Sequence, residues 1–224
     1  MRDFMLANLA AMIWVIVAIE VIFGVLFVKE YQKGKSKMVL SMLLIDLGLF
    51  LDALFIVLGV FTQNGLPEMV SRLRFVSHGV LIPLMFPICG YGLKLGQKAM
   101  KILWAATFVI MVLGLAQSLA IHLELRQLGT VLRHVSADSS PAWAEGISSL
   151  LSYGTVIPLI IVGIIVWVKQ KTPHLFLSGF LMFAFSALGP ATGNFDLIFF
   201  ISMIGEVFMV LFFYLYARVR AKRD

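Results

Sequence analysis

Four carboxylates lie inside long apolar stretches of the sequence: Glu20, Asp46, Asp52 and Glu206. No lysine or arginine lies in the middle of these stretches to balance their charge. An acid at the centre of a bilayer costs about 2.5–3.5 kcal/mol on insertion scales and tends to face the protein interior or a water-filled cavity. We therefore expect a polar interior that holds protons or a cation, and these four acids are candidate transport or ion-binding residues.

The spacing of two acids indicates separate surroundings. Asp46 and Asp52 are six positions apart, which places them about 120° apart around a helix at about 100° per residue. We expect one of them to pair with the first apolar stretch and the other with the last. The sequence leaves open an alternative in which the acids are protonated and hydrogen-bond to backbone or hydroxyl groups, joining helices together.

His78 lies about one helical turn inside the third apolar stretch and is a further transport or ion-binding candidate. It could relay protons with a nearby acid, and the alternative is an interfacial histidine that hydrogen-bonds to a neighbour. The histidines show no metal-ligand spacing, so neither a metal nor another cofactor is expected. Common hydrolase, phosphate-loop and dinucleotide motifs are absent, and Ser77 points about 100° away from His78 on a helix, so the sequence does not favour an enzyme.

The composition places these residues in an all-α integral membrane protein. Of the residues, 61% are hydrophobic and 13% charged, with a mean hydropathy of +0.99, which is too apolar for a soluble domain. Stretches of about 20 apolar residues can cross a hydrocarbon core of about 30 Å. We predict a single seven-transmembrane-helix bundle over residues 1–224, with helices at about 4–28, 38–61, 75–95, 102–122, 147–168, 175–193 and 197–217. The first stretch is longer than the apolar part of a signal peptide, so we expect it to be retained.

The basic residues predict the orientation of this bundle. Thirteen of the eighteen lysines and arginines fall in alternate loops and the C-terminal tail, and five fall on the other side. By the positive-inside rule the N-terminus is outside and the C-terminus cytoplasmic, in the cell membrane. Such a basic face contacts the bilayer and anionic lipids at its cytoplasmic surface, and we expect no nucleic acid as a partner.

A Ser-x-Gly-x-x-x-Pro pattern occurs twice, with the prolines at Pro83 and Pro158. Ten identities in forty positions relate residues 77–116 to 152–191, which suggests a repeated helical hairpin. Each proline should bend its helix and free the carbonyl of Gly79 or Gly154. These carbonyls could face a cavity and bind a cation or water, or the bends could serve packing alone.

The longest segment between the apolar stretches, about 123–146, is expected outside the membrane. Leu125, Leu128, Leu132 and Val135 recur at helical spacing, which predicts a short helix lying in the interface. Trp143 follows and is interpreted as an interfacial anchor.

The stretch from Arg74-Phe75 to Pro83-Leu84 resembles the third helix of the microbial rhodopsins, in which an arginine and an aromatic residue precede Pro-Leu at this distance. The resemblance implies a rhodopsin-like seven-helix topology. The last stretch, 197–217, holds no lysine that could form a retinal Schiff base, and Ser77 falls where a proton pump would carry its acid. Retinal is therefore not expected.

These observations predict a membrane protein that moves or senses a small cation or a proton-coupled solute through its polar interior. One alternative is a non-transporting receptor or accessory subunit in which the acids are structural. A membrane-embedded lipid enzyme is the third hypothesis.

Overall fold

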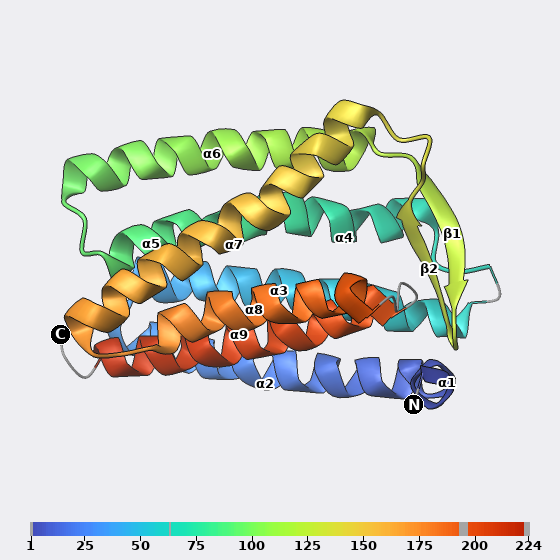
Figure 1. Ribbon diagram of the computed structural model, residues 1–224, viewed down its shortest axis with the longest axis horizontal. Coiled ribbons are helices and arrows are strands. Elements are labelled where there is room, and N and C mark those ends of the chain that lie inside the picture. The colour runs from blue at the N-terminus through green and yellow to red at the C-terminus, as the bar shows by residue number, and fades with distance from the viewer. Residues whose placement is uncertain (1, 63, 193–196, 222–224) are drawn as a thin grey trace.

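Long helices run back and forth through one bundle, and a β-hairpin lies across one end of it (Figure 1). The computed structural model describes residues 2–62, 64–192 and 197–221. The helices are α1 (Arg2–Ala7), α2 (Leu9–Gly34), α3 (Lys37–Leu58), α4 (Glu68–Leu81), α5 (Met85–Gly92), α6 (Gln97–Ala120), α7 (Ala142–Gln170), α8 (His174–Thr192) and α9 (Ile198–Ala221), with short 3-10 helices η1 (Gly59–Phe61) and η2 (Ile82–Leu84). Strands β1 (Leu123–Leu128) and β2 (Val131–Ser136) form the hairpin.

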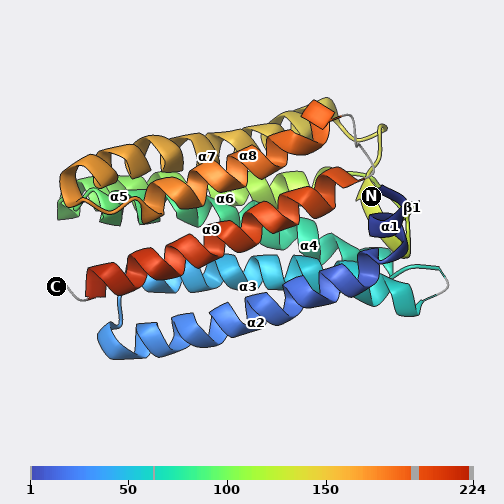
Figure 2. The ribbon, with the colours of Figure 1, turned by 60° about the horizontal axis from the view of Figure 1, so that its bottom comes forward.

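Six helical segments in the described ranges are long and apolar enough to cross a bilayer, as an all-α membrane protein requires. They are Leu9–Gly34, Lys37–Phe61, Glu68–Gly92, Gln97–Ala120, Ala142–Gln170 and Ile198–Arg220. A shorter apolar helix, His174–Leu188, lies where the sequence places its sixth stretch. Helix α9 lies between α8 and α2 (Figure 2), so the last helices of the chain close the bundle against the first.

The predicted helix at 75–95 begins seven residues earlier and is interrupted. It starts at Glu68, ends as α4 at Leu81, continues through η2, and resumes as α5. Pro83 lies in η2, where its missing N–H and its ring are tolerated in a tighter turn. Pro158, by contrast, lies inside the continuous helix α7. The two prolines of the suggested repeat therefore act differently.

The predicted interfacial helix near 123–146 is wrong, because this segment contains the β-hairpin. Strands β1 and β2 pair antiparallel, with Leu128 opposite Val131 and Arg126 opposite Arg133. Gly129 in the two-residue turn has φ +57°, a left-handed conformation that glycine adopts at little cost. Residues 123–126 in β1 alternate between apolar and polar with a period of two, which is also compatible with a strand.

Two glycines let α4 and α6 come into direct backbone contact. A Cβ atom built on Gly114 would lie 2.0 Å from the carbonyl oxygen of Gly79, and one on Gly79 would lie 2.5 Å from the carbonyl oxygen of Gly114. Any larger side chain at either position would overlap the opposite backbone. These glycines therefore allow the close packing of α4 against α6.

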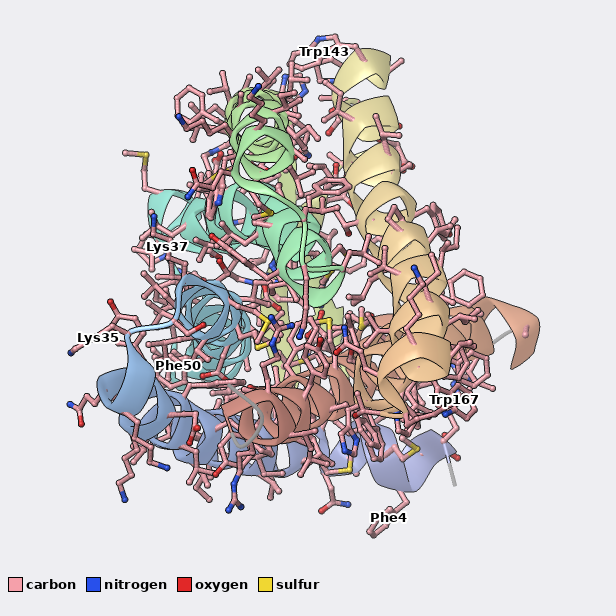
Figure 3. All side chains as sticks on the ribbon, turned by 90° about the vertical axis from the view of Figure 1, so that its left-hand side faces the viewer. Phe4, Lys35, Lys37, Phe50, Trp143 and Trp167 are labelled. Carbon is pink, nitrogen blue, oxygen red and sulfur yellow. The ribbon has the colours of Figure 1, made fainter. Side chains whose placement is uncertain are left out.

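The lysine-rich turns after α2, α5 and α7 lie at the same end of the bundle as the end of α9, opposite the hairpin (Figure 1). Figure 3 views the bundle from this end and labels Lys35 and Lys37, which extend from the turn between α2 and α3. Trp143, the predicted anchor, lies in the first turn of α7 and is exposed.

Candidate functional site

A cavity of about 400 Å³ lies beneath the hairpin, with walls from α3, α4, α7, α8 and α9. Most of its lining is apolar, but five acidic, basic or histidine side chains reach it: Asp52, Arg74, His78, Arg133 and Glu206. Its rim reaches the surface along α7, where Ser152 and Tyr153 are exposed. Polar groups converging on a mostly apolar pocket are the usual composition of a small-molecule site.

Arg74 and Asp52 form a buried ion pair in this cavity. The Arg74 Nε atom donates to Asp52 Oδ1 at 2.8 Å, and its Nη1 donates to the carbonyl oxygen of His134 at 3.2 Å. The sequence-based expectation that no base balances the acids is therefore wrong for Asp52. The early start of α4 at Glu68 places Arg74 roughly 9 Å into the helix instead of at its edge.

His78 stands between two acids that come from different helices. Its Nδ1 lies 3.9 Å from Asp52 Oδ1 on α3, and its Nε2 lies 3.7 Å from Glu206 Oε1 on α9. The His78 side chain is 36% exposed, against 11% and 12% for the two acids, so the imidazole is the member of this group that a solute in the cavity reaches. The distances suit ion pairs of a protonated imidazole more than short hydrogen bonds.

Glu20 and Asp46 form a second group, outside the cavity lining. Their carboxyl groups face each other between α2 and α3, and both residues are 1% exposed. Both Glu20 oxygens and Asp46 Oδ1 are buried and have no hydrogen-bond partner among the residues that the structure describes. The structure thus separates Asp46 from Asp52, as the spacing indicates, and Asp46 lies beside Glu20 of the first apolar stretch. Asp52 pairs with Arg74 and lies near His78, both on α4, so its expected pairing with the last apolar stretch is not found within the described ranges.

Arg133 is a site residue that the sequence analysis missed. It reaches the cavity from β2, its guanidinium lies 4.2 Å from the centre of the Phe199 ring, and its buried Nε has no hydrogen-bond partner in the described ranges. Burial, and then the nearby charge of Arg74, lower the pKa of Arg133 to about 9, so it stays charged at neutral pH. The sequence analysis missed it because it interpreted residues 123–146 as an interfacial helix and not as a hairpin that covers the cavity.

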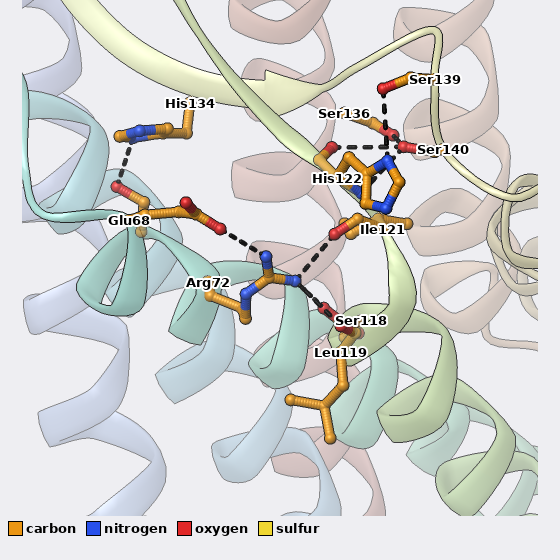
Figure 4. Close-up of polar contacts among 11 residues, drawn as sticks. Glu68, Arg72, Ser118, Leu119, Ile121, His122, His134, Ser136, Ser139 and Ser140 are labelled. Atoms are coloured by element: carbon orange, nitrogen blue, oxygen red, sulfur yellow. Dashed lines mark hydrogen bonds and ion pairs between the residues drawn. The ribbon is translucent and has the colours of Figure 1, made fainter.

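Polar contacts fasten the hairpin and the end of α6 to α4 (Figure 4). Arg72 donates to the carbonyl oxygens of Ser118, Leu119 and Ile121 at 3.0, 3.2 and 2.9 Å, and pairs with Glu68 at 2.6 Å.

On β2, the neighbour of Arg133 is held as well. His134 Nδ1 lies 2.9 Å from the hydroxyl oxygen of Ser71 on α4, and burial lowers the pKa of His134. Because His134 and Arg74 both tie β2 to α4, the backbone that carries Arg133 has a fixed position over the cavity.

The kink candidates divide into two unlike pairs. The carbonyl of Gly79, expected to be free because of Pro83, faces Gly114 on α6, which makes this position a close helix contact. At Gly154 a Cβ atom would meet only Leu150 of the same helix within 4 Å, so no neighbouring helix approaches there. The interpretation of both positions as matched cation ligands finds no support in these contacts.

The polar groups offer little for hydrolysis or metal binding. The Ser77 hydroxyl donates to the carbonyl oxygen of Arg74 at 2.8 Å and is not paired with His78. Within the described ranges no group of three or more His, Cys, Asp or Glu side chains could hold a metal ion. Cys89 is a buried free thiol.

Comparison with known proteins assigns no family to the chain. No protein-family profile matches the chain. No curated protein matches it in sequence.

Proposed function

We propose that this protein moves or senses a small cation or proton-coupled solute in the cavity beneath the hairpin, and that the coupled ion is the proton. The observation that carries the proposal is the position of His78, within 4 Å of both Asp52 on α3 and Glu206 on α9. Histidine changes its charge near neutral pH more readily than any other side chain. A change of charge at His78 would alter the attraction among three helices at once.

The surroundings favour a proton over a metal cation. Asp52 already accepts a hydrogen bond from Arg74 and lies beside His78, so a metal ion would compete with two bases for this carboxylate. Protons need no such coordination sphere, since they can be exchanged between a histidine and a carboxylate over short distances.

The second acid pair supports a path through the bundle. Glu20 lies within electrostatic reach of Glu206 as well as beside Asp46. Two ionised carboxyl groups without a base would repel each other strongly in a bilayer, so Glu20 and Asp46 together would hold at least one proton or cation. The series from Asp52 through His78 and Glu206 to this pair would then carry protons from the hairpin end toward the middle of the membrane.

In this proposal α8 also crosses the membrane, which brings the number of transmembrane helices to seven, and the N-terminus is outside the cell membrane. Nineteen residues span about 28 Å at 1.5 Å each, close to the thickness of a hydrocarbon core. The lysine-rich turns at the end opposite the hairpin are the cytoplasmic ones by the positive-inside rule, where they contact anionic lipids. The hairpin then closes the outer side of the cavity.

Proton flux into liposomes that hold a pH-sensitive dye tests the proposal, measured between pH 5 and pH 8 with purified protein. Glu206→Gln and His78→Gln should retain the wild-type melting temperature and lose the pH-dependent flux. His122→Gln is the matched control, because His122 contacts Ser139 near the bundle end and lies outside the cavity lining. Wild-type protein without flux would contradict proton movement, and full flux in both variants with an unchanged pH profile would contradict the role proposed for His78 and Glu206.

The second candidate is a receptor or accessory subunit whose acids are structural. The buried Arg74–Asp52 pair favours it, because such a pair joins α3 to α4 without any need for a transported ion. Under this candidate Glu206→Gln changes neither flux nor pH response. Glu206→Ala lowers the melting temperature, because it removes the polar group that neighbouring side chains contact.

A further inference from the structure

The charges in the cavity leave one cation without a partner. Asp52 pairs with Arg74 at 2.8 Å, and Glu206 faces His78 at 3.7 Å. Arg133 forms no ion pair and no hydrogen bond with any residue in the described ranges; the charge of Arg74 repels it, and those of Asp52 and Glu206 attract it from beyond ion-pair distance. Both acids of the lining thus contact Arg74 or His78, and Arg133 has no acid in contact.

A guanidinium in this position needs an anion. Taking a charged group out of water costs several kcal/mol unless it gains a partner of opposite charge. Stacking on Phe199 replaces part of the lost hydration, but it satisfies none of the N–H donors. Arg74 and Ser71 hold the neighbouring residue His134, so the backbone of Arg133 stays over the cavity.

The rest of the cavity accepts an apolar body of limited size. Phe199, which contacts Arg133, lines the cavity together with Met203, Leu151 and Met182, and serines 148, 152, 186 and 202 add hydroxyl groups to the lining. At about 400 Å³ the space lies near the lower end of the about 300–1,000 Å³ that small-molecule sites occupy.

We propose that the cavity binds a small organic carboxylate, with the carboxylate on the guanidinium of Arg133 and the apolar body against Phe199 and Met203. The planar guanidinium presents paired N–H donors that match the two oxygens of a carboxylate. This inference rests on the proposed function only in taking the cavity as the solute site, and it names the class of solute. Such a ligand could come from water as a compact aromatic acid or from the bilayer as a fatty acid.

Direct binding to the purified full-length protein in lipid nanodiscs tests the inference, by calorimetric titration with three probes. Benzoate represents the soluble source, laurate the membrane source, and benzamide is the neutral analogue of benzoate. We expect at least one of the two acids to bind, and benzamide to bind at least tenfold more weakly than benzoate where benzoate binds. Binding of benzoate identifies the soluble source, and binding of laurate alone identifies the bilayer.

The matched variants are Arg133→Gln and Arg126→Gln, since Arg126 lies directly opposite Arg133 in the hairpin but is exposed and pairs with Glu124. Arg133→Gln should weaken binding of the acid tenfold or more, and Arg126→Gln should leave it within twofold of wild type. Arg133→Lys keeps the charge without the paired donors and should give an intermediate affinity, which covers the case in which Arg133→Gln does not fold.

Two results would overturn the inference: neither acid binds the wild-type protein, or the acid binds equally well after Arg133 is replaced. The outcome of the proton-flux experiment is independent of the outcome of this binding experiment. Carboxylate binding that depends on Arg133 in a protein without proton flux would leave this site in place and remove the transport function.

Discussion

The buried pair of Arg74 and Asp52 allows a quantitative test of how the charges around the cavity are balanced. The two side chains are only 7% and 11% exposed and lie 2.8 Å apart. Removing one partner of a buried pair leaves an uncompensated charge and costs about 3–5 kcal/mol. At about 2–4 °C per kcal/mol for a chain of this length, each single substitution should lower the melting temperature by about 6–20 °C.

The structure also predicts which single substitution is worse. In Arg74→Met, Asp52 retains His78 at 3.9 Å, which can supply a compensating positive charge. In Asp52→Asn, the guanidinium of Arg74 retains the carbonyl of His134 but no acid in contact among the described residues. Asp52→Asn should therefore be the more destabilising change, and the double variant should cost less than the sum of the two.

Thermal unfolding of the four proteins in nanodiscs measures this cycle. Glu124→Gln is the control, because Glu124 pairs with Arg126 and both side chains are exposed, so that removal of this ion pair costs about 1 kcal/mol or less. Strictly additive single effects, or a larger loss in Arg74→Met than in Asp52→Asn, would refute the reasoning about compensation.

Three further predictions concern the fold and its orientation. Gly114→Ala should strongly destabilise the protein by backbone overlap, whereas Gly146→Ala, with open space around it, should be neutral or stabilising by about 0.5–1 kcal/mol; equal melting temperatures would contradict the close contact. Because burial lowers the pKa of His134, the folded state binds fewer protons than the unfolded state just below the unperturbed pKa of about 6.5, so stability should fall as the pH drops through this range. Replacement by glutamine should reduce that dependence in melting curves at pH 5 and pH 8, and an unchanged dependence would exclude this histidine as its source. In intact cells, a membrane-impermeant thiol reagent should label Gln127→Cys and not Lys35→Cys, and the reverse pattern would invert the proposed orientation.

The sequence predicts the helices better than it predicts which side chains pair between them. Apolar length is a local property, so the membrane class and most spans follow from it directly. The division between Asp46 and Asp52 follows from helical periodicity. The pairing of Asp52 with Arg74 could not be predicted, because it depends on where α4 begins. The helix begins at Glu68, before its apolar part.

The hairpin shows a different difficulty. Its leucines fit a helical spacing, and only residues 123–126 alternate as in a strand. Tertiary contacts favour the hairpin: Thr130 N–H donates to the carbonyl of Leu6, and Gly59 lies against the carbonyl of Leu132. Arg133 could be recognised as a cavity residue only after the strand register was known.

The contacts of Arg72 have a consequence for how the chain is made. The last carbonyls of a helix have no hydrogen-bond donor within that helix. At the end of α6, the guanidinium of Arg72 on α4 supplies the donors. Since α4 precedes α6, the donor has already left the ribosome when its acceptors emerge, and α6 can be completed as soon as it enters the membrane. The contact between Arg72 and the end of α6 therefore involves only residues that precede the hairpin, and its formation does not require the hairpin or helices α7 to α9.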